Sequence, residues 1–263
     1  FIAAAILNIA EDHLDWHGSF DAYAAAKISL LDKSTTAILN GDDPAIVTRA
    51  NHWLGRKVFF SLDTPAPGEI GIVEELLIDR AFVADPMEAS MFCELVEVTP
   101  TVPHNVANAL AAAGLARVIG IDHEKIREAI KSFVPGRHRI EKVLVKDEIT
   151  WINDSKATNP HAAAASIMSA LSVIWIAGGL AKGATMSELV KRTKSRIRAA
   201  ILIGEDRELI AQELRAHAPE VEIVMIDAPT DYSRGSTSNT LMEAVVGAAH
   251  ARAKSGDTVL LAP

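Results

Sequence analysis

The sequence predicts an α/β protein whose second half forms a mainly parallel, doubly wound sheet. After residue 136, short apolar segments of strand length alternate with segments whose apolar residues recur at helical spacing. Val134-Pro135-Gly136 has the composition of a linker and separates this regular half from a first half with a different pattern. With 263 residues, 49% of them hydrophobic and 23% charged, the chain can fold as one large or two ordinary domains.

The first half is expected to combine short apolar strands, a region of antiparallel strands and several helices. Pro44 suits the first position of a helix, and Asp122 suits the cap of another. The expected strands are Phe1–Asn8, Thr36–Leu39, Lys57–Phe60 and short antiparallel strands within Ile70–Glu97, and the expected helices are Phe20–Asp32, Pro103–Ile119 and Asp122–Ser132.

The second half is expected to alternate strands with helices along its whole length. Thr185 and Glu188 match a capping box at the start of one helix. The expected strands are Ile140–Val145, Thr150–Ile152, Val173–Ala177, Ala199–Ile203, Val221–Ile226 and Thr258–Leu261, and the expected helices are Pro160–Ala170, Met186–Lys194, Arg207–Ala216 and Thr240–Ala253.

The charge and cysteine content restrict the class of protein. A net charge of −8 argues against nucleic acid or an anionic membrane as the main partner. The single cysteine, Cys93, excludes an intrachain disulfide and favours a reducing, cytoplasmic setting. No apolar run reaches the roughly 18 residues of a membrane span. The chain starts on Phe1 inside an expected strand and stops at Pro263 just after another, so we expect both ends to be cuts through a longer protein.

The segment Trp151–Asn159 concentrates functional groups between an expected strand and an expected helix. Open α/β sheets bind their ligands at this edge, outside the carboxyl ends of the strands. The loop offers a carboxylate, two hydroxyls, an ammonium group and an amide, from Asp154, Ser155, Thr158, Lys156 and Asn159. It is therefore the first candidate for a binding site.

Two features of the first half have both a functional and a structural interpretation. Glu11–Asp15 follows a strand and contains carboxylates and His13, which suit Mg²⁺, but it also suits the charged start of a helix. Lys27 lies on the same helical stripe as Tyr23 and Leu31. It is either a lysine whose chain covers apolar surface or a partly buried group that is modified or pairs with a metal or phosphate.

Three further motifs are equally ambiguous by themselves. Asn105 and Asn108 share a helix face and suit the edge of a purine, or else Asn105 caps the helix. Gly136–Arg139 is either a phosphate-binding segment or a solvated basic loop. Gly178–Gly183 is a glycine-rich turn between a strand and a helix in which Lys182 offers a charge to an anion, and it is not a P-loop.

Together these segments resemble the Mur ligase family, and within it the members that add D-glutamate. Six stretches match in order and spacing, and Asp154–Asn159 discriminates best between members of the family. The other five are Leu7–Asp15, Tyr23–Lys27, His104–Leu110, His138-Arg139, and Gly178-Gly179 with Lys182.

The resemblance implies a partial central mononucleotide-binding domain in residues 1–136 and a Rossmann-like C-terminal ligase domain in residues 137–263. It implies a monomeric amide ligase of peptidoglycan precursor synthesis that uses ATP and Mg²⁺, with UDP-N-acetylmuramoyl-L-alanine and D-glutamate as substrates. ATP would phosphorylate the carboxylate of the nucleotide sugar, and the amine of D-glutamate would then attack the acyl phosphate. No nucleic-acid or membrane partner is expected.

The resemblance also implies roles for individual residues. His13 and a carbamylated Lys27 would bind magnesium and act in catalysis. The nucleotide would be bound by Asn105, Asn108, Arg139, Asp154 and Lys156, and the D-glutamate carboxylates by Thr158 and Lys182.

The sequence departs from the family pattern in ways that bear on activity. The family's N-terminal domain, its P-loop and a metal-binding glutamate have no counterpart here, and the family continues beyond the position of Pro263. We therefore expect this chain alone not to be a competent ligase. Two alternatives remain open: a non-catalytic module that binds nucleotide and amino acid, and a folylpolyglutamate-type ligase, against which the loop at Asp154–Asn159 argues.

Overall fold

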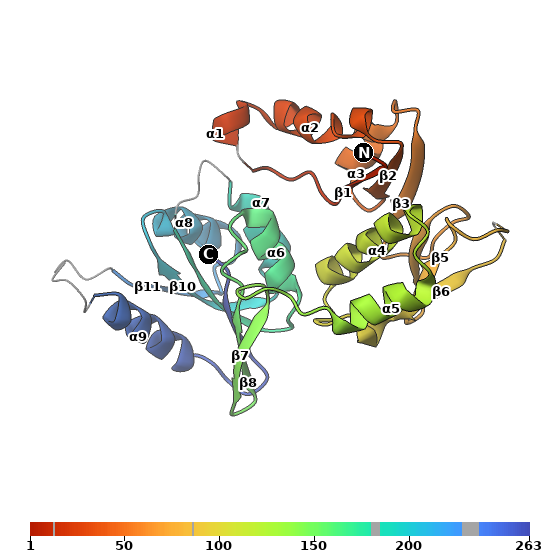
Figure 1. Ribbon diagram of the computed structural model, residues 1–263. Helices are drawn as coiled ribbons and strands as arrows, with labels where there is room; N and C mark the ends of the chain where they lie inside the picture. The colour runs from red at the N-terminus through yellow and green to blue at the C-terminus, as the bar shows by residue number, and fades with distance from the viewer. Residues whose placement is uncertain (13, 86, 180–184, 228–236) are drawn as a thin grey trace. The chain divides into compact units, whose positions relative to one another are not determined.

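The chain divides into two compact units, Phe1–Val134 and Pro135–Pro263, shown by the computed structural model in Figure 1. The structure describes residues 1–12, 14–85, 87–179, 185–227 and 237–263. The boundary predicted from the sequence, after Gly136, lies two residues beyond the division. No helix in the described ranges is long and apolar enough to cross a membrane.

The first unit contains a six-stranded sheet whose strands lie side by side in chain order. Strands β1 to β4 are parallel, whereas β4, β5 and β6 pair antiparallel, as predicted for Ile70–Glu97. The strands are β1 (Ala3–Ile6), β2 (Thr36–Asn40), β3 (Arg56–Phe60), β4 (Ile70–Val73), β5 (Leu76–Asp79) and β6 (Ser90–Glu94).

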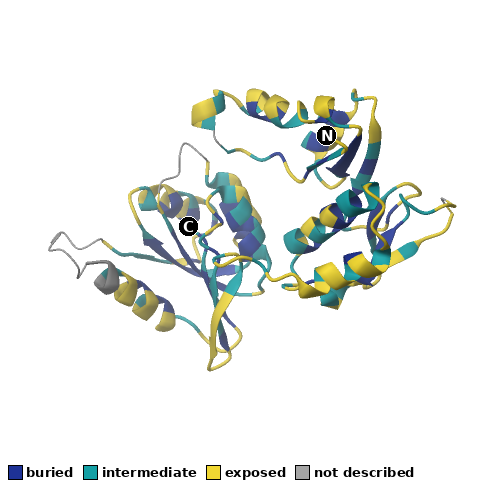
Figure 2. Cartoon of the chain, in the orientation of Figure 1, coloured by how far each residue is buried: buried dark blue, intermediate teal, exposed yellow. Residues whose placement is uncertain are grey.

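Both faces of this sheet are covered by helices because its strands alternate their side chains between two cores. In β2, Ile38 points into a core formed with α4 and α5, whereas Ala37 and Leu39 point into a core formed with α2 and α3. Figure 2 shows buried residues along the strands of this sheet. The helices are α1 (Leu14–His17), α2 (Phe20–Ile28), α3 (Pro44–Ala50), α4 (Pro103–Val118) and α5 (His123–Ser132), with 3₁₀ turns at Leu31–Lys33 and Leu95–Glu97.

The second unit contains the predicted doubly wound, mainly parallel sheet. Its strand order is β11-β10-β9-β12-β8-β7, and only the β7–β8 pair is antiparallel among the described pairs. The last strand of the chain therefore lies between β8 and β9. The strands are β7 (Glu141–Lys146), β8 (Ile149–Asn153), β9 (Val173–Gly178), β10 (Ile197–Ile203), β11 (Glu222–Met225) and β12 (Thr258–Leu261).

Helices also cover the two faces of the second sheet, again through alternation along the strands. In β9, Val173 and Trp175 belong to the core under the helices α6, α7 and α8, whereas Ile174 and Ile176 belong to the core under α9. The helices are α6 (Pro160–Met168), α7 (Ser187–Thr193), α8 (Arg207–His217) and α9 (Thr237–His250).

Most helix boundaries differ from the predictions by a few residues, as in α9, which spans Thr237–His250 in place of the expected Thr240–Ala253. Two further differences bear on specific expectations. The helix expected over Phe20–Asp32 ends at Ile28 and is followed by a 3₁₀ turn. The capping box expected at Thr185 is absent, because α7 begins only at Ser187 and its N-cap, Met186, has no capping side chain. Glu188 is then the second helical residue and not the third, so it lacks the spacing that a capping box requires.

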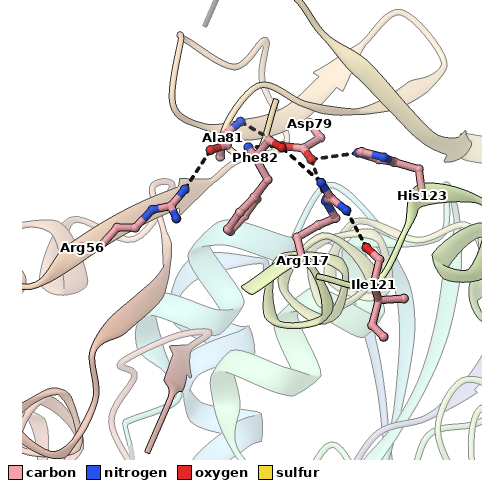
Figure 3. Close-up of polar contacts among 7 residues, drawn as sticks. All are labelled: Arg56, Asp79, Ala81, Phe82, Arg117, Ile121 and His123. Carbon is pink, nitrogen blue, oxygen red and sulfur yellow. Dashed lines mark hydrogen bonds and ion pairs between the residues drawn. The ribbon is translucent and has the colours of Figure 1, made fainter. Parts of the chain in front are cut away.

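A buried carboxylate joins the end of β5 to α4 and α5. Asp79 is 0% exposed, and its Oδ1 accepts hydrogen bonds of 2.9 Å from the backbone N–H groups of Ala81 and Phe82. Its Oδ2 lies 2.9 Å from Nε2 of His123 and 3.3 Å from Nε of Arg117, as Figure 3 shows. Because Arg117 also donates to the carbonyl of Ile121, at 2.6 Å, the cluster fixes where α4 ends and α5 begins.

We predict that Asp79→Asn destabilises the protein by about 3 kcal/mol, because removing one charge of a buried pair leaves the other without compensation. Urea unfolding of the variant and the wild type measures the difference. Asp122→Asn is a matched control, since Asp122 is exposed, lies 3.7 Å from Lys125 and caps α5, a position that asparagine also fills well. Equal stability of the two variants would contradict the prediction.

A second ion-pair network joins Glu97 to α5. Arg127 donates to both carboxylate oxygens of Glu97, with Nε 2.8 Å from Oε2 and Nη2 2.9 Å from Oε1, and Lys131 lies 3.1 Å away. The hydrogen bonds from Arg127, followed by one from the backbone N–H of Glu94, lower the pKa of Glu97 from 4.5 to about 2. Glu97 therefore stays ionised well below the pH at which an ordinary glutamate is protonated.

This depressed pKa predicts how the pH dependence of stability changes on Glu97→Gln. The carboxylate contributes stability above pH 4.5, and that contribution is lost as the pH falls from 4.5 towards 2. As the pH is lowered across this interval, the free energy of unfolding should therefore fall more steeply for the wild type than for Glu97→Gln. Parallel curves for the two proteins would show that Glu97 does not carry this dependence.

Candidate functional site

The polar loop after β8 lies at the carboxyl edge of the parallel sheet in the second unit. Strand β8 ends at Asn153 and α6 begins at Pro160, so the loop has the predicted strand-to-helix position. Asn159 is the N-cap of α6, and its side-chain oxygen accepts a hydrogen bond of 2.8 Å from the N–H of Ala162. The loop is thereby fixed at both ends by regular structure.

Asp154 holds this loop in place from inside. Its side chain is 7% exposed, and Oδ1 accepts a hydrogen bond of 3.1 Å from the N–H of Ile140. Its own N–H donates to the carbonyl of Leu261 at the end of β12, and its carbonyl accepts from the N–H of Ala157, both at 2.8 Å. Asp154 therefore connects the loop to β12 and to the segment that enters the second unit.

That entering segment, residues 137–141, has an unusual backbone. His138 and Ile140 have φ angles of +67° and +46°, a region that side chains rarely adopt and that is least favourable for a β-branched residue such as Ile140. The N–H of His138 donates to Glu141 at 2.8 Å, and its carbonyl accepts from the N–H of Lys156 at 3.2 Å. Arg139 lies between the two strained residues and is exposed.

The structure brings Arg139, Asp154 and Lys156 into two segments that are hydrogen-bonded to each other. Arg139 and Lys156 are both exposed, and neither has an ion-pair partner among the residues that the structure describes. Two uncompensated cations on neighbouring segments suit a polyanionic ligand. Thr158, the residue expected to bind the amino acid, is exposed on the same loop.

The glycine turn after β9 is required by backbone packing. A Cβ on Gly178, whose φ is +133°, would lie 1.7 Å from the carbonyl oxygen of Ile203, and one on Gly204 would lie 2.6 Å from the nitrogen of Gly179. The ends of β9 and β10 thus meet through glycine, which accounts for Gly178 without any ligand. Lys182, predicted to bind D-glutamate, falls outside the described residues.

We predict that Gly178→Ala destabilises the protein by more than about 2 kcal/mol, since the side chain would add backbone strain to a clash with a carbonyl. Gly247→Ala in α9 is the matched control: nothing lies within 4 Å of its added Cβ, and alanine is favoured in a helix by roughly 0.5–1 kcal/mol. Thermal unfolding of both variants should show opposite shifts. A Gly178→Ala protein as stable as the wild type would refute this account of the turn.

In the first unit, Lys27 reaches the loop that follows β1. Its Nζ donates to the carbonyl of Asn8 at 3.0 Å and lies 4.8 Å from the centre of the Tyr23 ring. The same loop is held by Asp43, which accepts from the N–H of Ile9 at 2.8 Å while capping α3. The side chain of Lys27 is half-buried and directed at the predicted metal-binding loop.

A metal centre is not formed by the described part of this loop. His13 lies outside the described residues, and in the rest of the chain no group of three His, Cys, Asp or Glu side chains could hold a metal ion. Cys93 is buried and belongs to the core of the first unit. Burial raises the pKa of its thiol to about 11, so the reactive thiolate is disfavoured.

A mainly apolar pocket of about 410 Å³ opens between α4 and α5. Asn105 and Asn108 both line it, together with Thr99, Lys125 and a set of apolar residues that includes Ala109, Ala112, Ile126 and Phe133. The capping role considered for Asn105 is wrong, because α4 has Val102 as its N-cap. Asn105 instead donates from Nδ2 to the carbonyl of Pro100 at 2.9 Å, which fixes the plane of its amide.

Sequence reasoning missed the groups that hold the site residues in place. Asn153 donates to the ring of His138 at 2.8 Å, and Glu141 accepts from the backbone of His138. The only sequence signal for Asn153 was an amide at the end of an apolar strand. A contact between residues fifteen positions apart has no local pattern that would reveal it.

Comparisons with known proteins match both units. A model of the Mur ligase middle domain matches residues 1–116, and a model of the Mur ligase glutamate ligase domain matches residues 138–263. UDP-N-acetylmuramoylalanine–D-glutamate ligase of Thermobifida fusca is 49% identical over 265 residues, which cover 99% of this chain and 55% of that protein. The chain therefore spans about half the length of the curated relatives that it matches.

Solved structures show the same fold at low sequence identity. MurF from Acinetobacter baumannii has a TM-score of 0.68 and 17% identity, covering 98% of this chain and 56% of that chain. The bifunctional folylpolyglutamate synthase/dihydrofolate synthase of Yersinia pestis has a TM-score of 0.61 and 17% identity, covering 99% of this chain and 58% of that chain. These likenesses concern the fold alone.

Proposed function

The chain belongs to the Mur ligase family, and we propose that it forms part of an ATP-dependent ligase that joins D-glutamate to UDP-N-acetylmuramoyl-L-alanine. The sequence relatives support this substrate, since proteins named for that reaction are 42–49% identical to the chain. In this proposal the chain supplies the base pocket and phosphate-binding residues for the nucleotide and one end of the D-glutamate site.

The observation that carries the proposal is the pair of uncompensated cations at the carboxyl edge of the second sheet. Arg139 and Lys156 are exposed on segments that hydrogen-bond to each other through the carbonyl of His138 and the carboxylate of Asp154. A guanidinium and an ammonium on two such neighbouring segments offer positive charge to the same phosphate chain, whose negative charge would compensate theirs. The buried Asp154 keeps the two segments together through its hydrogen bond from the N–H of Ile140.

The pocket beside α4 supports a purine as the base. Its alanine-rich walls offer a flat apolar surface, and its two asparagines offer both donors and acceptors to the base edge. Because Nδ2 of Asn105 already donates to Pro100, its Oδ1 would be the atom that accepts from a ligand donor, such as the amino group of adenine. Asn108 lies three residues further along the same face of α4, and both the NH₂ group and the oxygen of its amide can bind the base.

The reaction is phosphoryl transfer followed by amide formation. The substrate carboxylate displaces ADP from the terminal phosphorus of ATP, which gives an acyl phosphate. The neutral amine of D-glutamate then attacks the acyl carbon, and its nitrogen gives up a proton to solvent. Collapse of the tetrahedral intermediate breaks the bond to the phosphate oxygen, expels phosphate and leaves the amide. In this scheme Arg139 and Lys156 stabilise negative charge on the phosphates, while Thr158 and Lys182 bind and orient the incoming amino acid.

The magnesium site stays a prediction from the sequence. Bound magnesium would neutralise charge on the transferring phosphoryl group. An unmodified lysine is an ammonium group and cannot bind a cation, so Lys27 would have to be carbamylated to act as an anionic ligand beside His13. Its Nζ is directed at the backbone of the loop that contains His13, which is compatible with that role.

Of the two alternatives, a folylpolyglutamate-type ligase has only the shared fold in its support, at 17% identity. A non-catalytic module would bind the same nucleotide and differ only in chemistry. Nucleotide binding is therefore the property to test first, because both a ligase and a non-catalytic module require the proposed site to bind nucleotide.

We predict that Lys156→Ala lowers the affinity of the chain for ATP about tenfold, because the variant loses one charge-assisted hydrogen bond. Titration followed by backbone amide chemical shifts detects weak binding and locates it. Adenosine should shift the amides of Asn105 and Asn108, and ATP should additionally shift those of Arg139 and Lys156. The affinity for adenosine should not change in the variant.

Lys142→Ala is the matched control, since it removes an exposed lysine from the edge strand β7 outside the loop. It should bind ATP as the wild type does. If Lys156→Ala weakened adenosine and ATP equally, or if ATP shifted none of these amides, the proposed nucleotide site would be wrong.

A further inference from the structure

The ring of His138 is held by Asn153 in one tautomer. The backbone N–H of Ser155 donates to Oδ1 of Asn153 at 3.1 Å, and since an N–H can only donate, the oxygen of the amide must face it. The NH₂ group of Asn153 therefore faces His138, with Nδ2 2.8 Å from Nδ1 of the ring. Nδ1 must then accept, so it carries no proton and the hydrogen of the neutral ring is on Nε2.

Glu141 does not disturb this arrangement. Its carboxylate lies 3.7 Å from Nδ1 of His138, beyond hydrogen-bond distance, and it accepts from the backbone N–H of the same residue at 2.8 Å. That hydrogen bond lowers the pKa of Glu141 below its ordinary value, so the carboxylate remains an acceptor for the backbone. The ring of His138, 44% exposed, is thus oriented by Asn153.

We propose that His138 is a positioning residue, whose ring and backbone hold the segment carrying Arg139 against the loop carrying Asp154 and Lys156. Three hydrogen bonds join the two segments: from Asn153 to the ring at 2.8 Å, from the N–H of Lys156 to the carbonyl of His138 at 3.2 Å, and from the N–H of Ile140 to Asp154 at 3.1 Å. His138 takes part in two of them.

The backbone on both sides of Arg139 explains why a supporting contact is needed. His138 at φ +67° and Ile140 at φ +46° both adopt positive φ, which is uncommon outside glycine and, although histidine tolerates it better than most residues, is a genuine outlier for the β-branched Ile140. Strained residues persist only where neighbouring contacts hold them. The hydrogen bond from Asn153 is such a contact, and it fixes the direction in which Arg139, between the two strained residues, leaves the backbone.

This inference rests on the proposed function for its consequence, since Arg139 and Lys156 are the proposed phosphate ligands. The positioning itself can be measured without any ligand. The two measurements therefore separate a failure of the positioning role from a failure of the nucleotide-binding role.

Two substitutions at His138 separate the ring from the backbone. His138→Asn keeps an acceptor oxygen near the place of Nδ1, and asparagine tolerates positive φ. His138→Gly accepts positive φ with no strain but removes the acceptor. A third variant, Asn153→Asp, keeps the acceptor for Ser155 and replaces the donor by an oxygen, so it should move the ring proton to Nδ1.

The experiment uses the 263-residue chain labelled with ¹⁵N. Histidine ring spectra should show His138 with an unprotonated Nδ1 in the wild type and a protonated Nδ1 in Asn153→Asp. Exchange of the Lys156 amide hydrogen should become about tenfold faster in His138→Gly, as expected for the loss of one supporting hydrogen bond, and should return to within about threefold of the wild type in His138→Asn. The affinity for ATP should be lowest in His138→Gly and should return towards that of the wild type in His138→Asn.

A proton on Nδ1 in the wild-type chain would overturn the proposal, as would unchanged Lys156 exchange in His138→Gly. Equal exchange in His138→Gly and His138→Asn would also overturn it, because the acceptor would then be irrelevant. If the unaltered chain binds no ATP while the tautomer and exchange results hold, the proposed function fails and the positioning of the loop stands.

Discussion

The loop after β8 depends on one buried carboxylate, that of Asp154. Its backbone is tied to the end of β12, and its side chain is tied to the segment that begins the second unit. A buried carboxylate without such donors would be strongly destabilising, so the loop and the entering segment can adopt these positions only together. Everything exposed on the loop, Lys156 and Thr158 included, takes its position from this arrangement.

In the first unit, too, a buried carboxylate joins separate segments of the chain. Asp79, also buried, accepts from two backbone N–H groups and lies beside Arg117 and His123, and this cluster sets the junction between α4 and α5. The pocket with Asn105 and Asn108 is formed by those two helices. In each unit, therefore, a buried, hydrogen-bonded aspartate supports side chains that are themselves available to a ligand. The groups that bind and the groups that hold them are different residues.

Much of the fold could be predicted because it follows from local pattern. Alternation along β9 and the apolar stripe of α4 are decided by burial, which the sequence shows directly. The start of α7 could not be predicted, because a capping box is recognised by its spacing alone and the helix begins one residue later than expected, at Ser187. The interpretation of the glycine turn was incomplete for a similar reason: the neighbour of Gly178 is a strand distant in the sequence. The hydrogen bond between Asn153 and His138 likewise depends on tertiary structure.

The contact between Gly178 and Ile203 has a consequence for how such a sequence can evolve. The atom that excludes a side chain at position 178 is a backbone carbonyl oxygen, and the atoms that crowd Gly204 are backbone atoms of Gly178 and Gly179. Every amino acid carries the same backbone, so no replacement at the opposing position can make room. A core cavity or a clash between side chains can be repaired by a second mutation, but a clash between a side chain at position 178 and the opposing backbone has no such suppressor. Homologous chains that keep the two strand ends at this separation have glycine as their only solution at position 178.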